Sequence, residues 1–223
     1  MNILALETST AACSIALQVS KELLVFHEVA PMQHTQLILP KIHEMLKEGN
    51  LNLVDLDAIC FSEGPGSFTG LRIAASVTQG LSFPHQIPVI SLSSMAVWAQ
   101  TAFIDRGWAN TLVCVDAKME AVYLGIYQIN DGLAQPVMND TFFKPKQTFE
   151  AAGIPTLANQ KWYAVGDGWV NYGTNLVKSL NLEPQKIDNA LLPKASAMLF
   201  LATEKLRRSE HCTAFEAMPN YLR

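Results

Sequence analysis

The sequence predicts an α/β protein built by duplication of one unit. An order of three strands, helix, strand, helix, short strand and helix can be followed along the chain twice, and each copy opens with an apolar strand that ends on an acid. These opening strands are Ile3–Leu6, which leads to Glu7, and Leu112–Val115, which leads to Asp116. The chain has 223 residues, 49% of them apolar, enough for one large domain or two small ones that share a cleft. We place the expected division between residues 1–107 and 108–223.

In the first half, short apolar runs predict strands and longer amphipathic runs predict helices. Pro40 lies within the first helix and should kink it rather than end it, because the apolar stripe continues on both sides of the proline. The expected elements are strands Ile3–Leu6, Cys13–Val19 and Glu22–Glu28, helix His34–Glu48, strand Ala58–Phe61, helix Thr69–Leu81, strand Val89–Ile90 and helix Ser93–Asp105.

The second half repeats this order. In each half the sixth residue after the acid lies in the second strand, Cys13 after Glu7 and Val122 after Asp116. The expected elements are strands Leu112–Val115, Ala121–Gln128 and Pro136–Phe143, a short helix near Gln147–Ala152, strand Trp162–Val165, helix Trp169–Leu180, a strand near Ile187 and helix Ala195–Arg207.

Composition excludes several classes of protein. A net charge of −4 argues against a broad basic face that binds nucleic acid by itself. The N-terminus lacks the basic region of a signal peptide, and no apolar run approaches the roughly 20 residues of a membrane helix. The four cysteines have no CxxC spacing, so we expect buried free thiols. Together these features predict a cytoplasmic protein with no membrane segment.

The segment Gly64–Arg72 joins an apolar strand to a helix through three glycines and a proline. Such a turn could hold phosphate on its free amides, or it could be a rigid corner that directs the helix toward a partner. The spacing fits neither a Walker A loop, nor a dinucleotide fingerprint, nor a nucleophile elbow, and no lysine follows. We therefore interpret the segment as a rigid corner, with a minor anion-holding role left open for Gly66 and Ser67.

Six blocks of sequence carry a resemblance to a known family. Through them the chain resembles the actin, Hsp70 and sugar-kinase (ASKHA) superfamily, in which two βββαβαβα-type halves flank a nucleotide cleft. Within it the chain is similar to the TsaB family of bacterial tRNA threonylcarbamoyladenosine (t6A) biosynthesis proteins. The blocks are Ile3–Thr10, His34–Gln36 with Leu39–Pro40, Gly64–Ile73, Val115–Glu120 with Val122–Tyr123, Gly166–Trp169 and Pro219–Arg223.

The resemblance implies a non-catalytic scaffold or activator subunit. In this family TsaB pairs with the catalytic subunit TsaD for threonylcarbamoylation of N6 of adenosine 37 in tRNAs that read codons beginning with A. The ATPase TsaE and the adenylate-forming TsaC work with them. It further implies a homodimer when the chain is alone and tRNA contact only within the complex. No cofactor of its own is implied, since ATP and a metal ion are expected only in the partner subunits.

The strand-end acids Glu7 and Asp116 could handle magnesium, phosphate or water in a fold of this type. The simpler expectation, which we favour, is that each accepts hydrogen bonds from its own turn and holds the hairpin in shape. Arg72 and Lys118 are the best basic candidates for an anion or a tRNA backbone, although the expectation that we favour for both is a surface salt bridge.

No metal site is expected. The TsaD family uses a His-xxx-His pair on a helix, and the corresponding stretch here, Ser93–Trp98, has no histidine. His34 and His43 share a helix but, nine residues apart, face opposite sides. We expect His34 to cap the first turn of this helix, with a partner contact as the alternative.

Two apolar stripes lie on neighbouring helices. Either could be core or partner interface, and the residues leave the two equal; the family resemblance favours a shared role. The expected interface residues are His34, Leu37, Ile38, Leu71, Ala74, Ala75, Thr78 and Leu81. Two other functions remain as alternatives: an ATP-dependent phosphotransferase of the sugar-kinase type, suggested by the strand-end acids, and a glycoprotease-like metallopeptidase.

Overall fold

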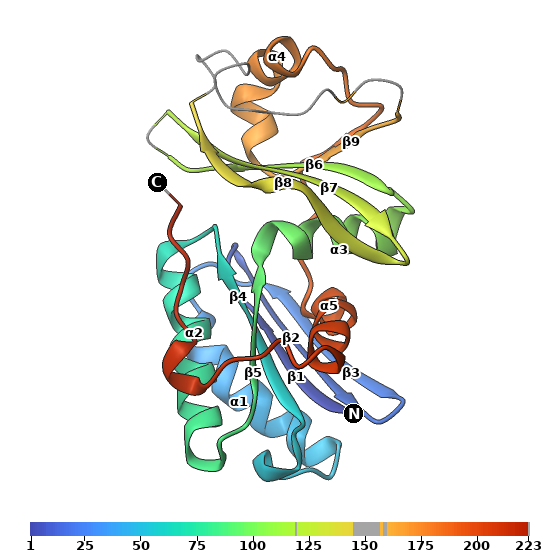
Figure 1. Cartoon of the computed structure of the whole chain (residues 1–223). Coiled ribbons are helices and arrows are strands. Elements are labelled where there is room, and N and C mark those ends of the chain that lie inside the picture. Colours follow the sequence, from blue (N-terminus) through green and yellow to red (C-terminus); the bar gives the residue numbers. More distant parts are fainter. Residues whose placement is uncertain (119, 145–156, 158–159, 223) are drawn as a thin grey trace. The chain divides into compact units, whose positions relative to one another are not determined.

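The computed structural model describes residues 1–118, 120–144, 157 and 160–222. The chain divides into two compact units. The first comprises Met1–Val97 and Pro193–Tyr221, and the second comprises Trp98–Leu192 and Leu222–Arg223. Each unit contains a five-stranded mixed sheet (Figure 1).

The sheet of the first unit has the order β3-β2-β1-β4-β5. β1, β2 and β3 pair antiparallel, whereas β4 and β5 extend the sheet in parallel from β1. The bounds are β1 Asn2–Glu7, β2 Ala12–Val19, β3 Glu22–Val29, β4 Ala58–Gly64 and β5 Val89–Ser93.

Helices cover both faces of this sheet (Figure 1). α1 (His34–Glu48) and α2 (Phe68–Ser82) place apolar side chains, such as Ile42 and Ala74, in one core with Leu4 and Ile15 of the strands. α5 (Ala195–Arg207) packs on the other face. Three short 3₁₀ turns complete the unit: η1 Leu53–Asp55, η2 Phe83–His85 and η4 Ala214–Glu216.

The second unit repeats the sheet order as β8-β7-β6-β9-β10. α4 (Gly168–Leu180) packs Trp169 and Leu176 against the buried side of the strands. The boundary between the two units falls within α3 (Ser94–Arg106), since the second unit begins at Trp98. The strands are β6 Asn110–Asp116, β7 Val122–Asn130, β8 Leu133–Phe143, β9 Tyr163–Val165 and β10 Ile187–Asp188.

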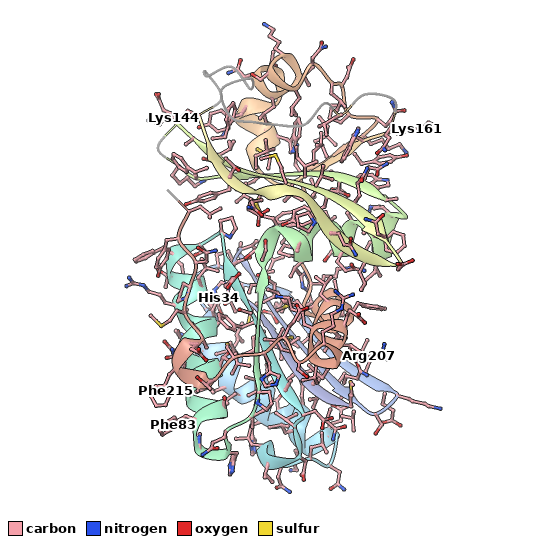
Figure 2. The ribbon with its side chains drawn as sticks, viewed as in Figure 1. His34, Phe83, Lys144, Lys161, Arg207 and Phe215 are labelled. Carbon is pink, nitrogen blue, oxygen red and sulfur yellow. The ribbon has the colours of Figure 1, made fainter. Side chains whose placement is uncertain are left out.

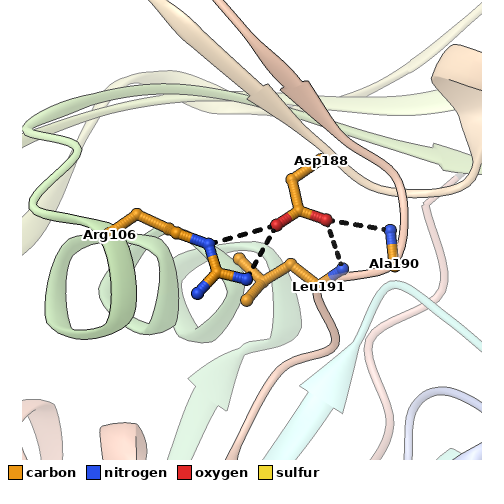
Figure 3. Close-up of polar contacts among 4 residues, drawn as sticks. All are labelled: Arg106, Asp188, Ala190 and Leu191. Carbon is orange, nitrogen blue, oxygen red and sulfur yellow. Dashed lines mark hydrogen bonds and ion pairs between the residues drawn. The ribbon is translucent and has the colours of Figure 1, made fainter.

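A polar cluster joins the end of α3 to β10 within the second unit (Figure 3). Arg106 donates from Nε and Nη2 to one Asp188 oxygen at 3.2 and 3.0 Å, and the other oxygen accepts from the Ala190 and Leu191 amides. Partial burial acts to raise the pKa of Asp188, but these hydrogen bonds outweigh it and hold that pKa below its ordinary value. These hydrogen bonds hold the segment that follows β10 against the end of α3.

The matching sheet orders confirm the predicted fold class, a duplicated α/β fold. The expected helices and strands that fall on described residues are all present, with ends that differ by a few residues, and His34–Glu48 and Ala195–Arg207 have the expected bounds. α1 continues through the exposed Pro40 because the buried Ile38 and Ile42 anchor it on both sides. The expected helix near Gln147–Ala152 lies outside the described residues.

The compact units differ from the expected division at residue 107. α5, assigned from the sequence to 108–223, packs with the first unit. Its buried side chains, among them Ala197 and Met198, cover the sheet. Its ends are fixed there as well, because the Ala195 amide donates to Ser14 Oγ at 3.0 Å and Lys205 Nζ donates to the Ser91 carbonyl at 3.1 Å.

Two compositional expectations can be compared with the structure. Cys13, Cys60 and Cys114 are buried free thiols, as predicted, and Cys212 is partly exposed. None of the helices in the described part of the chain combines the length and the apolar character that crossing a membrane requires.

Candidate functional site

The Gly-rich corner is held by close backbone contacts with the turn after β1. Gly64 has a φ of +121°, which a residue with a side chain rarely adopts, and a cis peptide bond joins it to Pro65. The Ser67 amide donates to the Ser9 carbonyl at 2.7 Å, and the Ser67 hydroxyl accepts from the Gly70 amide at 3.3 Å as the cap of α2. The corner thus uses part of its own hydrogen-bonding capacity to position α2.

Glu7 is completely buried at the carboxyl end of β1. Its Oε1 accepts from the Ser9 amide at 2.6 Å, and its Oε2 accepts from the Ser62 hydroxyl on β4. Burial raises the pKa of the Glu7 carboxyl above its usual value, although the bonds from Ser62 and Ser9 act in the opposite direction. Oε1 therefore bonds to the turn, as expected. The bond from Ser62 to Oε2 is not predicted by the local sequence, because it depends on the register of β1 and β4.

Asp116 occupies the equivalent place at the end of β6. It accepts from the Lys118 amide at 2.7 Å and forms an ion pair with Lys118 Nζ at 3.3 Å. The Asp116 amide donates to Asp167 at 2.9 Å, and Asn171 of α4 donates to the Asp116 carboxylate at 3.5 Å. The expected turn bond is present. Asp167 and Asn171 were not named as site residues, because only the fold brings α4 to β6.

Among the residues that the structure describes, Arg72 has no partner for the surface salt bridge expected from the sequence. Within the described residues its guanidinium lies 3.8 Å from the centre of the Phe68 ring, and its Nε donates to the Tyr221 hydroxyl at 3.0 Å. The reason is that the C-terminal segment returns to the Gly-rich corner, where the Asn220 amide also donates to the Glu63 carbonyl at 2.7 Å. Arg72 remains exposed and keeps further donors.

His34 does not cap α1. The residue before the helix is Gln33, which makes no side-chain cap, and His34 lies inside the first unit with its Nε2 3.1 Å from the Ala12 carbonyl oxygen (Figure 2). Only 7% of His34 is exposed. The reason for the difference is that the helix begins against β2, so its first side chain turns inward to a strand carbonyl instead of back to its own amides.

The expected interface stripe packs largely within the first unit. Ile38, Ala74 and Ala75 belong to its core, and Leu71 and Thr78 are also buried. Leu37 and Leu81 are half-buried at its margin. The outward side of α2 instead presents Arg72, Ser76 and Gly80.

A groove lies beside this margin. It has a volume of about 550 Å³, between the second half of α1, the turn that follows it and the end of α2. Its wall includes Leu39, Ile42, His43, Leu46, Lys47 and Leu81. In the described part of the chain there is no group of three or more His, Cys, Asp or Glu side chains that could hold a metal ion.

Comparison with known proteins gives consistent matches over the whole chain. A family model described as TsaD, tRNA N6-adenosine threonylcarbamoyltransferase, matches residues 25–223. The chain is 35% identical to TsaB, a tRNA threonylcarbamoyladenosine biosynthesis protein of Haemophilus influenzae, with 100% of this chain and 94% of the relative covered. It is 34% identical to the Escherichia coli protein of the same name, covering 100% and 95%. The solved structure of YeaZ from Pseudomonas aeruginosa matches with a TM-score of 0.88 at 36% identity, over 99% of each chain.

Proposed function

Because the chain belongs to the TsaB family of tRNA threonylcarbamoyladenosine biosynthesis proteins, we propose that it is the non-catalytic scaffold or activator subunit of the t6A complex. The complex would place the threonylcarbamoyl group on N6 of adenosine 37 in tRNAs that read codons beginning with A. The chain would act by forming a heterodimer with the catalytic subunit TsaD.

The observation that supports a non-catalytic role is the state of the two strand-end acids. Glu7 is buried, with hydrogen bonds from Ser9 and Ser62, and Asp116 accepts from the backbone and side chain of Lys118. Catalytic carboxylates must reach a substrate, a metal or a water molecule. Both carboxylates instead accept hydrogen bonds from neighbouring parts of this chain. This favours a structural role for two positions at which a kinase-like relative could place catalytic acids.

The proposed partners follow from the family. TsaD would supply the reaction, with ATP and a metal ion in the partner subunits; TsaE and TsaC would act in the same pathway in the cytoplasm. The chain would form a homodimer when alone and would contact tRNA only within the complex. No cofactor is proposed for this chain itself.

The partner surface is best placed on the outward side of α2. Ser76 and Gly80 are exposed and one helical turn apart, and a Cβ added to Gly80 would meet no atom within 4 Å beyond its chain neighbours and the backbone of its own helix. Two small residues at this spacing allow a second helix to approach closely. The half-buried Leu37 and Leu81 would add apolar contact at the edge of the same helix pair.

Ser76→Arg is expected to weaken the complex with TsaD at least tenfold, on the order of 1.4 kcal/mol, because a guanidinium in a close helix contact would be neither solvated nor paired. The chain itself should fold normally, since Ser76 is exposed. Size-exclusion chromatography with light scattering measures the mass of the complex, and transfer of labelled threonylcarbamoyl to tRNA measures its activity.

Thr174→Arg is the matched control, because it places the same side chain at an exposed position of α4. Ala75→Arg would be a poor test, since Ala75 is 4% exposed and its replacement would disturb the core. If Ser76→Arg and Thr174→Arg leave the complex equally intact, the outward side of α2 is not the partner surface. Full transfer by TsaD without this chain would contradict the activator role.

A further inference from the structure

Within the described residues the two sheets have four edge strands, and three of these are protected against pairing with another strand. The edge of β5 is covered, because Val89 exchanges backbone hydrogen bonds with Cys212 at 3.0 and 2.8 Å. β8 contains Pro136, and its pairing with β7 shifts register twice. β10 has only two residues. Covering, proline, irregular register and shortness are devices by which proteins prevent edge-to-edge association.

In the same described residues, β3 has none of these four devices. It is eight residues long, it contains no proline, glycine, lysine or arginine, and it pairs with β2 in unbroken register from Val29 to Glu22. In the part of the chain that the structure describes, β2 is its single neighbour in the sheet. Leu23, Val25 and Val29 are 51%, 49% and 60% exposed. An apolar edge of this length is a template for a further strand.

The register of β2 and β3 determines which backbone N–H and C=O groups of β3 face away from β2, toward the open edge of the sheet. The two-residue loop Ser20–Lys21 joins β2 to β3, so the closing pair Val19 and Glu22 exchanges hydrogen bonds. Alternate residues of β3 therefore turn their N–H and C=O groups toward β2. Leu23, Val25 and Val29 have the opposite parity and turn theirs to the open edge.

Charge determines which strand would fit. Glu22 and Glu28 stand near the two ends of β3, both exposed and both on one face. A second copy that paired antiparallel with Val25 opposite its own Val25 would place Glu22 opposite Glu28 at both ends, and like charges in directly opposite positions are destabilising. A strand with a basic residue at each of these positions would form two favourable cross-strand pairs instead.

We propose that β3 is a docking edge for an extended segment of a partner protein, in which two basic residues flank a stretch of alternating apolar residues. The segment would add a sixth, antiparallel strand to the sheet of the first unit. Backbone hydrogen bonds along Leu23, Val25 and Val29 would supply affinity, and Glu22 and Glu28 would select the basic partner.

A synthetic peptide tests this proposal with the full chain. The probe is Lys-Thr-Val-Thr-Val-Thr-Lys with blocked ends, and the comparison peptide has glutamate in place of both lysines. In a titration of the ¹⁵N-labelled chain followed by NMR, the basic peptide should shift the amide signals of β3 and slow hydrogen exchange at Leu23, Val25 and Val29. The acidic peptide should bind about tenfold more weakly, because two exposed charge pairs are lost.

Variants separate the two parts of the proposal. Glu22→Lys combined with Glu28→Lys should reverse the preference between the peptides. Val25→Pro removes one outward N–H at a place where an edge strand tolerates proline, and should abolish binding, whereas Val25→Thr keeps the N–H and should bind. Equal binding of both peptides, signal shifts away from β3, or self-association of the chain that Val25→Pro abolishes would each overturn the proposal. The result is independent of the TsaD test, because Ser76 lies on α2.

Discussion

Gly70→Ala is expected to lower the free energy of unfolding by about 3 kcal/mol or more, since the new methyl group would overpack a contact between two backbone segments. A Cβ at Gly70 would stand 1.9 Å from the Thr8 carbonyl oxygen and 3.0 Å from the Thr8 carbonyl carbon. This contact is closed from both sides, because the Thr8 hydroxyl donates to the Gly70 carbonyl at 2.7 Å. Urea denaturation followed by circular dichroism measures the loss.

Gly80→Ala is the matched control, because it makes the same change on the same helix. A Cβ at Gly80 meets no atom within 4 Å beyond its chain neighbours and the backbone of its own helix, so only the helix propensity changes. Alanine in a helix interior is favoured over glycine by about 1 kcal/mol, and the variant should be more stable than the parent. Opposite signs for the two variants would establish that the corner depends on close backbone approach. Similar effects would show that the turn can move to accept a side chain.

Glu7→Gln is expected to raise the stability of the chain at neutral pH and to remove part of its pH dependence. Burial raises the pKa of Glu7 in the folded chain, so the folded state holds this proton more tightly than the unfolded state does. Unfolding free energy should therefore fall as the pH rises from the unfolded pKa to the folded pKa. Above the folded pKa, the unfolding free energy is lower by about 1.4 kcal/mol for each unit by which the folded pKa of Glu7 exceeds its unfolded pKa.

Glutamine keeps the geometry without the ionisation. Its carbonyl oxygen can accept from the Ser9 amide as Glu7 Oε1 does, and its amide can donate to the Ser62 hydroxyl. Denaturation at a series of pH values from 4 to 8 compares the variant with the parent, and Glu48→Gln at the exposed end of α1 is the control. A variant that is less stable at every pH would mean that the hydrogen bonds of the carboxylate outweigh the cost of its burial.

Much of the fold could be predicted because its signals are local. The stripe on α1 has helical periodicity, and both of its ends were located correctly despite Pro40. The repeated order of elements predicted two similar sheets, and the strand order is the same in both. The turn bonds at Glu7 and Asp116 were also anticipated, since an acid followed by polar residues commonly accepts from amides two positions on.

The errors concern contacts between distant segments. His34 was expected to cap its own helix but reaches the Ala12 carbonyl. Arg72 was expected to form a salt bridge but stacks on Phe68 and bonds to Tyr221, 149 residues away. α5 was assigned to the second half, whereas it covers the sheet of the first unit. In each case the local pattern predicted the element correctly but did not indicate which distant segment the element contacts.

The sequence by itself determined the order and type of the elements, the duplication and the family. Periodicity, turn residues and motif blocks lie within short stretches of chain and need no knowledge of distant contacts. Only the tertiary structure decided that the stripe on α2 is mostly core, that Glu7 is completely buried beside Ser62, and that β3 is, among the edge strands of the described residues, the one that is longer than two residues and has no proline, irregular register or covering segment. The reason is physical: burial and strand pairing depend on which segments meet in space, and a stripe of Leu and Ala has the same pattern whether it meets the protein's own sheet or a partner.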